Sequence, residues 1–531
     1  MPFSGPYPDL VIPECSVYDL LFASLEGSDE GRTAFIDATS GDRTTYGRLR
    51  EQVDELAMLL ARNGIRPGDV VGLLSPNSPR FGVGFHAILR AGAVATTLNA
   101  ICTAGDGAAQ LTDAKASALL TAEATAETAR AAAASAGIPP HRVFVLDGAD
   151  SVMERARTER DAVEDLPTVT AGDLAVLPYS SGTTGRPKGV MLTHGNLVAN
   201  VCQVEPLFPV AREDVVSAIL PFSHIYGMTM LLNVSLRARA ALVTLPRFEI
   251  QAFLGSIETH RCSLLLVAPP VAVMLAKGSA VEEYDLTSVH TVFSGAAPLD
   301  RALAGVVAER LACRIRQGYG MSEMAPVSHL VPFERDDVDP SSVGFTVPNM
   351  TCKLVDIETG EEIRVPEEGS SPPGELWCAG PNVMSGYLGN EEATRQTIDA
   401  EGFLHTGDIA TVDARGVVTI VDRLKELIKY KGYQVPPAEL EALLLTHDGV
   451  ADAAVVGVRD AEGEEVPKAF VVRQPDADVD ADDIMGFVAA RVSPHKKVRA
   501  VEFVAAIPKS PSGKILRREL RATGAATTRS S

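Results

Sequence analysis

The eleven residues from Tyr179 to Gly189, Tyr-Ser-Ser-Gly-Thr-Thr-Gly-Arg-Pro-Lys-Gly, combine hydroxyl groups, glycines and one lysine. They follow the strand-like run Leu174 to Leu177. Glycines let backbone N–H groups approach an anion, hydroxyls add neutral donors, and Lys188 adds a positive charge. Glycine follows the lysine, so this is not the GxxxxGK[ST] phosphate loop. The segment predicts a loop that binds a polyphosphate, the ordinary alternative being a flexible polar hairpin.

Five further motifs follow in the chain. They are Gln317 to Glu323 (QGYGMSE), Gly374 to Gly380 with Ser385 to Leu388, His405 to Asp408, Asp422 to Gln434, and Pro508 to Lys514. Taken singly, Glu323 reads as a solvated carboxylate, Asp408 as a turn or cap residue, and Lys514 as an exposed lysine. Their occurrence as one ordered set favours a shared active site.

This ordered set resembles the adenylate-forming superfamily: acyl-CoA synthetases, firefly-type luciferases and peptide adenylation domains. Pro221 to Gly227 (PFSHIYG), Ser294 to Pro298 and Lys425 to Val435 (KELIKYKGYQV) are most similar to 4-coumarate–CoA ligases and their bacterial relatives. The resemblance implies that a carboxylate attacks the α-phosphorus of ATP, giving acyl-AMP and pyrophosphate, and that a thiol then displaces AMP. It implies ATP, Mg²⁺ and coenzyme A as cofactors.

The resemblance also implies roles for individual residues. The phosphate-binding set is Ser180, Ser181, Gly182, Thr183, Thr184, Gly185 and Lys188. The set that frames the adenine is Gly295, Ala296, Ala297, Pro298, Gln317, Gly318 and Tyr319, with Ser322 beside it. Thr184 and Glu323 would hold Mg²⁺, which prefers oxygen ligands. Asp408 and Arg423 would bind the ribose. Lys514 would bridge the substrate carboxylate and the α-phosphate.

Thioester formation needs different groups at the same adenylate. The resemblance implies a rotation of the C-terminal domain about a hinge at Asp422 to Lys425, with Lys425 as its pivot. The groups implied for thioester formation are Lys429, Lys431, Gly432 and Gln434, with Arg247 at the nucleotide phosphates of CoA. The alternative is that the three lysines form a solvated basic face.

The predicted acid pocket is apolar with a single phenol. Its residues are Tyr226, Met230, Ala296, Met324, Ala325, Pro326 and Val327. Such a wall suits an aryl-propenoic acid or a medium-chain fatty acid. An amino acid would need a carboxylate for its ammonium, and Leu220 to Leu232 holds none. His224 would form a pocket wall that moves when the thiol enters, the alternative being a core histidine.

The sequence departs from plant 4-coumarate ligases at Ser322, Met324 and Pro436. From the resemblance and the apolar pocket we expect an acid–CoA ligase acting on an aryl-propenoic acid of 4-coumarate or cinnamate type. The alternatives are a medium-chain fatty acyl-CoA ligase and a standalone adenylating enzyme that loads a carrier protein. A luciferase-like oxygenase would oxidise its adenylate. A non-catalytic relative would be expected to lack Lys514 or Glu323.

Strand-like and helix-like runs alternate along most of the chain, for example Asp69 to Leu74, Pro79 to Arg90 and Ala93 to Leu98. This alternation predicts parallel sheets flanked by helices, with ligands at the carboxyl ends of the strands. Residues 331–421 read as a β-rich subdomain. We predict an α/β fold with a large N-terminal domain at 1–422 and a small, mobile α+β C-terminal domain at 423–531.

Composition sets limits on partners. The 531 residues carry 48 Lys and Arg against 69 Asp and Glu, a formal charge of −21. This acidity disfavours binding to nucleic acid or to anionic lipid. The seven cysteines form no C-x-x-C pair, and no signal peptide or membrane span is evident. We expect a cytoplasmic monomer or weak homodimer that binds a small carboxylic acid, ATP and CoA.

Overall fold

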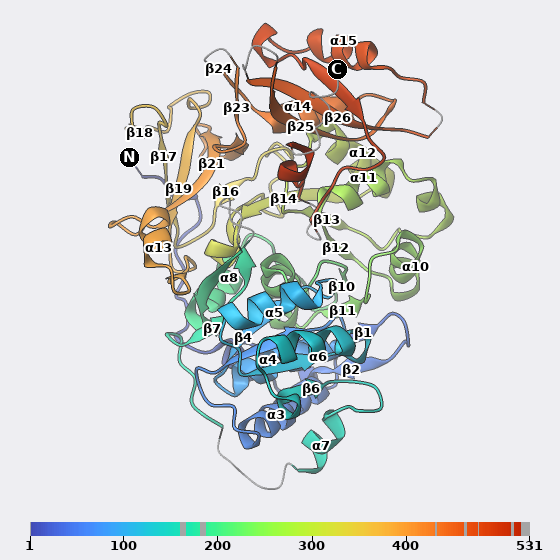
Figure 1. The fold of residues 1–531 in the computed structure, drawn as a ribbon, viewed down its shortest axis with the longest axis vertical. Coiled ribbons are helices and arrows are strands. Elements are labelled where there is room, and N and C mark those ends of the chain that lie inside the picture. The colour runs from blue at the N-terminus through green and yellow to red at the C-terminus, as the bar shows by residue number, and fades with distance from the viewer. Residues whose placement is uncertain are drawn as a thin grey trace.

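The fold is α/β, as predicted, in a computed structural model that describes residues 2–159, 166–180, 187–430, 433–460, 465–475, 477–510 and 514–521. Figure 1 shows the elements from β23 onward gathered at one end of the long axis, above the helix-flanked sheets. Two large sheets, a smaller antiparallel sheet and this C-terminal part make up the molecule.

The first large sheet carries the predicted phosphate loop at one side. Its strand order is β20-β9-β7-β4-β3-β5-β6, with β8 paired to β9. The bounds are β3 (Val70–Leu74), β4 (Val94–Leu98), β5 (Ala118–Thr121), β6 (Val143–Val145), β7 (Leu174–Val176), β8 (Tyr179–Ser180), β9 (Lys188–Thr193) and β20 (Gly386–Tyr387). Strands β3 to β7 pair in parallel and β9 is antiparallel. The predicted strands at 69–74 and 93–98 are confirmed as β3 and β4.

The second large sheet has the order β16-β15-β14-β13-β12-β10-β11-β1-β2. Its bounds are β1 (Thr33–Asp37), β2 (Arg43–Thr45), β10 (Val215–Ala218), β11 (Ala241–Thr244), β12 (Leu264–Val267), β13 (Thr291–Ser294), β14 (Arg314–Gly320), β15 (Val327–Leu330) and β16 (Phe345–Thr346). The chain between β10 and β14 keeps the parallel pairing that strand–helix alternation predicts. Strands β15 and β16 extend the sheet with antiparallel pairs.

Helices pack on these two sheets through their apolar faces. The bounds are α1 (Val17–Phe22), α2 (Gly27–Glu30), α3 (Tyr46–Arg62), α4 (Pro79–Arg90), α5 (Ala104–Asp113), α6 (Ala126–Ser135), α7 (Met153–Thr158), α8 (His194–Val204), α9 (Val234–Ala238), α10 (Ile250–His260), α11 (Pro269–Lys277) and α12 (Arg301–Leu311). The helix predicted at 79–90 is confirmed: Ser78 caps it through Phe81 N, and Pro79 suits its first turn. No helix of the described residues is both long and apolar enough to cross a membrane.

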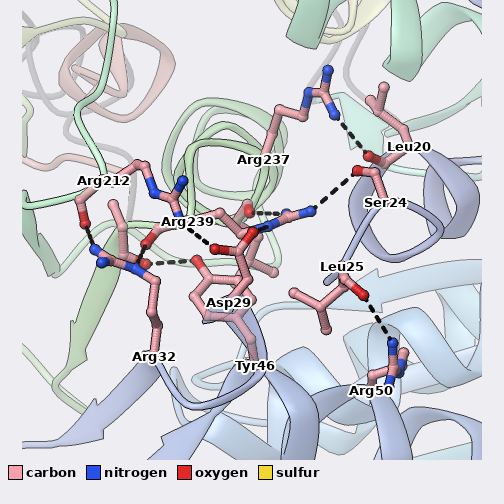
Figure 2. Close-up of polar contacts among 12 residues, drawn as sticks. Leu20, Ser24, Leu25, Asp29, Arg32, Tyr46, Arg50, Arg212, Arg237 and Arg239 are labelled. Atoms are coloured by element: carbon pink, nitrogen blue, oxygen red, sulfur yellow. Dashed lines mark hydrogen bonds and ion pairs between the residues drawn. The ribbon is translucent and has the colours of Figure 1, made fainter. Parts of the chain in front are cut away.

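An arginine-rich network fastens the start of the chain to the second sheet (Figure 2). Asp29 pairs with Arg212 and with Arg239, whose Nε lies 3.4 Å away. Arg32 donates to the backbone carbonyl of Arg239. The hydroxyl of Tyr46 donates to the backbone carbonyl of Ala240 at 2.7 Å. These contacts join α2 and α3 to the turn before β11, and thereby hold β1 beside β11.

The β-rich region expected at 331–421 forms a five-stranded sheet of order β18-β17-β19-β21-β22, together with β16 and β20 of the large sheets. The bounds are β17 (Thr351–Val355), β18 (Glu362–Ile363), β19 (Gly374–Ala379), α13 (Glu391–Thr397), β21 (Leu404–Val412) and β22 (Val418–Arg423). All neighbours in this sheet are antiparallel. The sheet brings Asp408 on β21 directly opposite Arg423 on β22.

The C-terminal part is α+β, as predicted. Its elements are β23 (Ile428–Tyr430), β24 (Tyr433–Val435), α14 (Pro437–Leu445), β25 (Val450–Arg459), β26 (Glu465–Arg473), α15 (Ala481–Ala489) and β27 (Ala500–Phe503). It has a core of its own, which includes Ile428, Leu440 and Val471. The division into 1–422 and 423–531 stays a prediction.

Candidate active site

The two ends of the predicted phosphate loop lie on paired antiparallel strands. Tyr179 pairs with Gly189 and Ser180 with Lys188, so both ends of the loop are fixed by β8 and β9. The Tyr179 hydroxyl donates to Asp113 at 2.5 Å and anchors the first strand on α5. Ser181, Gly182, Thr183, Thr184 and Gly185 lie outside the described residues. The buried hydroxyl of Ser180 has no hydrogen-bond partner within the described part of the chain, which leaves it available to a ligand.

Lys188 and Glu323 are connected through one tyrosine. The Lys188 ammonium lies 4.7 Å from the centre of the Tyr387 ring, a cation–π contact. The hydroxyl of Tyr387 donates to Glu323 Oε1 at 2.9 Å. Glu323 is buried, and its backbone carbonyl accepts from Met384 N. The structure therefore brings the predicted phosphate lysine and the predicted metal ligand to one place.

The loop after β13 begins at Gly295, where a Cβ would lie 3.0 Å from the ring of Tyr226, closer than side chains usually approach. Ala296 follows with a positive φ of 72°, which a glycine would adopt more readily. Ala297 and Pro298 complete the predicted adenine loop. Its far end is held by Gln317, whose side-chain amide accepts from Leu299 N at 2.9 Å and donates to Leu299 O at 3.0 Å. Gln317 thus positions this loop through its side chain, a use that the sequence did not indicate.

Three side chains from different strands meet at the predicted ribose site. The hydroxyl of Tyr319 donates to Asp408 Oδ2 at 2.6 Å, and Arg423 Nε lies 3.3 Å from Asp408 Oδ1. Burial raises the pKa of Asp408, against the opposing charge of Arg423. Gly318 is required beside them, because a Cβ would stand 2.7 Å from the Phe293 ring. Asp408 and Arg423 are predicted ligands that the sheet brings together.

Lys514 reaches the same site from the C-terminal part. Burial and, to a smaller extent, the positive charge of Arg423 lower the pKa of Lys514 to about 8. The negative charges of Glu426 and Asp408 act in the opposite direction. Burial together with the charge of Lys514 lowers the pKa of His224 to about 4. Lys514 is therefore electrostatically coupled both to the ribose site and to the apolar segment that carries His224. Its backbone N–H is held by the hydroxyl of Ser510 at 3.1 Å.

The predicted acid pocket is built on a π-helix, η3 (Tyr226–Asn233), which the sequence did not reveal. Gly227 is needed at its start, since a Cβ would lie 2.1 Å from the carbonyl oxygen of Pro221. Of the predicted pocket residues, Tyr226, Met230, Met324, Ala325, Pro326 and Val327 are buried, whereas Ala296 is exposed. The Tyr226 hydroxyl donates to backbone carbonyls of Val267 and Phe293 at 3.4 and 3.3 Å, so it is used within the protein.

Asn77 holds the segment before His224, and sequence reasoning missed it. Its amide nitrogen donates to the carbonyls of Ala218 and Leu220, and its oxygen accepts from Phe222 N at 2.8 Å. Tyr387 was also given no role, although it lies in the Ser385 to Leu388 motif. The motif was the available signal for Tyr387; Asn77 had none, because its partners are about 140 residues away.

Of the residues predicted for thioester formation, the structure describes the side chains of Lys429 and Arg247. Lys429 is exposed and lines an open cavity of about 510 Å³, together with Glu375, Trp377 and Leu424. Lys431, Gly432 and the side chain of Gln434 lie outside the described residues. Arg247 is 81% exposed and pairs with Glu249. Lys425 is exposed too.

The predicted hinge is fastened to the C-terminal part. Asp422 accepts from Ala438 N, at the start of α14, at 3.1 Å, and burial raises the pKa of Asp422 to about 6. Arg517 bonds to Glu426 at 2.7 Å and to Glu441 at 2.6 Å. The segment that includes the predicted pivot is thus flanked by contacts that would have to break or move with any rotation.

Known proteins match both parts of the chain. A family model described as "AMP-binding enzyme" matches residues 23–388, and one described as "AMP-binding enzyme C-terminal domain" matches 439–514. The chain is 39% identical to 4-coumarate-CoA ligase 1 of Narcissus pseudonarcissus, over 99% of this chain and 96% of that protein. It is 40% identical to 4-coumarate–CoA ligase 5 of Oryza sativa subsp. japonica, over 99% and 97%.

Solved structures agree with the fold. ATP-bound MatB from Rhodopseudomonas palustris superposes with a TM-score of 0.87 at 29% identity, covering 96% of this chain and 99% of that one. The apo form of MatB superposes with a TM-score of 0.77 at 28% sequence identity, with the same coverage of both chains. A benzoate CoA ligase from Burkholderia xenovorans LB400 superposes with a TM-score of 0.84 at 27% sequence identity, covering 95% of this chain and 99% of that one.

Fold and site define a nucleotide-dependent, adenylate-forming enzyme, and the predicted superfamily is confirmed. The chain belongs to the AMP-binding enzyme family.

Proposed function

We propose that this protein is an ATP-dependent carboxylic acid–CoA ligase that forms an acyl-AMP and then an acyl-CoA, with an aryl-propenoic acid of the 4-coumarate type as substrate. Relatives of about 40% identity carry the name 4-coumarate–CoA ligase. One observation supports the chemistry most directly: Lys514 is coupled to His224 on the apolar segment and to Asp408 at the ribose site. A cation between these sites can neutralise charge passing from a carboxylate to a phosphate.

The residues present fit a bound nucleotide. ATP, when bound, supplies the adenylyl group. We propose that Ser180 and Lys188 hold its terminal phosphates, and that the loop between them contributes Ser181, Thr183 and Thr184. The unpartnered, buried hydroxyl of Ser180 fits this use, because a ligand oxygen would satisfy it. Asp408 would accept from the ribose, and Arg423 would hold Asp408 in place.

The residues also fit Mg²⁺, which neutralises phosphate charge when bound. Glu323 offers a buried carboxylate, and Tyr387 fixes one of its oxygens by a hydrogen bond. A carboxylate with a hydroxyl, here that of Thr184, is a donor set suited to this hard cation. We propose these two residues as the metal ligands.

The second half-reaction needs another arrangement of the C-terminal part. The chain superposes better on ATP-bound MatB than on the apo form of MatB, with TM-scores of 0.87 and 0.77. Together with the inward position of Lys514, this supports an arrangement suited to adenylation. We propose that rotation at Asp422 to Lys425 then withdraws Lys514 and presents Lys429, Lys431, Gly432 and Gln434, with Arg247 binding the CoA phosphates.

The acid pocket favours an uncharged, apolar acyl group. Met230 and Met324 are buried, and methionine adapts its shape to a flat ring or to an alkyl chain. With its pKa near 4, His224 is neutral at pH 7 and adds no charge to this wall. The same wall would accept a medium-chain fatty acid, which therefore remains the second candidate.

A substrate panel tests the proposal. Cinnamates, benzoates and C4 to C12 acids are compared by CoA-dependent AMP release at equal concentration. The highest kcat/KM for a hydroxycinnamate supports the proposal; a maximum among the alkyl acids favours the fatty acyl alternative. Acyl-AMP formation without CoA turnover would point to a carrier-protein acceptor. A cytoplasmic location and a monomeric or weakly dimeric state stay predictions.

A further inference from the structure

Three side chains with metal-binding atoms meet in the interior, outside the nucleotide site. They are His329 on β15, Cys352 on β17 and Cys378 on β19, and each has no exposed surface. The histidine nitrogen and both sulfurs lie within 4.8 Å of one another. Within the described residues no other group of three or more His, Cys, Asp or Glu side chains has this geometry.

The spacing of these atoms suits a tetrahedral centre. Nε2 of His329 lies 3.7 Å from the sulfur of Cys352, and the two sulfurs are 3.6 Å apart. A Zn²⁺ ion with Zn–S of about 2.3 Å and Zn–N of about 2.0–2.1 Å would separate two sulfurs by about 3.8 Å and sulfur from nitrogen by about 3.6 Å. Thr346 Oγ1, 3.1 Å from Nε2 and 3.7 Å from the Cys352 sulfur, stands near the fourth corner.

A neighbouring hydroxyl orients the imidazole for this use. Ser328 Oγ lies 3.0 Å from Nδ1 of His329 and donates its own proton to the carbonyl of Tyr319. In the tautomer that donates Nδ1–H to Ser328, Nε2 carries the lone pair and lies 3.7 Å from the sulfur of Cys352. Metal-binding histidines are commonly held in this way through their other ring nitrogen.

The backbone presents the two thiols together. Cys352 and Cys378 stand directly opposite each other on antiparallel strands. The N–H and C=O of Cys352 both pair with Phe3, on the side away from β19. The two cysteines are therefore a cross-strand pair without mutual backbone hydrogen bonds, the kind whose side chains lie closest. A site carried by strands needs little adjustment to receive an ion.

We propose that His329, Cys352 and Cys378 form a buried site for a thiophilic cation, and that Zn²⁺ is the ion this ligand set fits. Two thiolates and one imidazole select such ions over Mg²⁺. Because the site is closed to solvent, the ion enters while the chain folds. The inference does not depend on the proposed ligase activity.

The position of the site gives the ion a structural role. It would link β15 of the second large sheet to β17 and β19 of the five-stranded sheet. Tyr319 is the register partner of His329, with ring centres 6.0 Å apart, and it bonds to Asp408. The ion would therefore fix the two walls of the predicted ribose site relative to each other.

Metal content of the full chain tests the site. Protein made in zinc-supplemented medium should carry about one zinc per chain. Cys378→Val and Cys352→Val should each bring this below about a tenth of an equivalent. Cys262→Val is the matched control: it removes another fully buried cysteine, from a separate core cluster, and should keep the zinc.

Cobalt provides a second measurement that needs no variant. The unsubstituted chain made with Co²⁺ should show the sulfur-to-cobalt charge-transfer band and the visible bands of a tetrahedral centre. The cobalt spectrum of the unsubstituted chain tests the site even if Cys378→Val fails to fold. Absence of both metals from the unsubstituted chain overturns the proposal, as does equal zinc in folded Cys378→Val. An intact mass lower by two hydrogens, with Cys352 and Cys378 both unreactive toward a thiol reagent, would show a disulfide in place of the metal site. That result would overturn the proposal too.

Discussion

The protonation of Lys514 should control the rate of the first half-reaction. Burial and the nearby Arg423 lower the pKa of Lys514 to about 8, more than two units below its ordinary value of 10.5. Only the charged ammonium can offset the negative charge shared by the carboxylate and the α-phosphate. The kcat/KM for ATP reports the free enzyme, in which this pKa applies.

The size of the effect follows from the titration. With a pKa of about 8, the charged fraction of Lys514 is about 90% at pH 7 and about 10% at pH 9. Adenylation measured as kcat/KM for ATP should therefore fall about tenfold between pH 7 and pH 9. Lys514→Arg keeps a positive charge throughout this range, because a guanidinium does not deprotonate there. Its absolute rate should drop, yet the fall above pH 8 should disappear.

The assay is ATP–pyrophosphate exchange with the best acid of the panel, from pH 6 to pH 10. Lys496→Ala serves as the matched control, since this lysine of the C-terminal part pairs with Glu439 on α14 and has no predicted role at the site. Its pH profile should match that of the unsubstituted enzyme. Lys514→Ala should abolish exchange while conversion of supplied acyl-AMP to acyl-CoA survives. Normal exchange in Lys514→Ala, or an unchanged alkaline fall in Lys514→Arg, would refute the reasoning.

Three other substitutions separate the remaining parts of the site. Gly432→Leu should block thioester formation and spare pyrophosphate exchange, because a side chain would obstruct the thiol's path; equal loss of both half-reactions would contradict this. Tyr387→Phe removes the hydrogen bond to Glu323 and should raise the Mg²⁺ concentration for half-maximal exchange about tenfold or more, whereas an unchanged Mg²⁺ titration would remove Glu323 from the metal site. Asp408→Asn should raise KM for ATP about tenfold with little change in KM for the acid. A melting curve controls for loss of fold, and Asp413→Asn, in the turn after β21, should leave both constants unaltered.

The sequence alone determined the class of chemistry and most of the elements. Glycines, hydroxyls and a lysine in one short segment indicate phosphate binding because their backbone and side-chain donors act locally. The helix at 79–90 was predicted with the bounds the structure has, since caps, prolines and periodicity are also local signals. The ordered motifs were sufficient to predict the family.

Only the tertiary structure decided how these pieces act on one another. The pKa of Lys514 depends on burial and on Arg423, which lies far away in sequence. Gln317 binds the backbone at Leu299, and Asn77 holds the His224 segment, because folding brings distant chain segments into contact. The same holds for His329, Cys352 and Cys378. Their spacing in sequence shows no metal motif. Their ligand atoms meet because β17 pairs with β19 and because folding brings β15 of another sheet beside them.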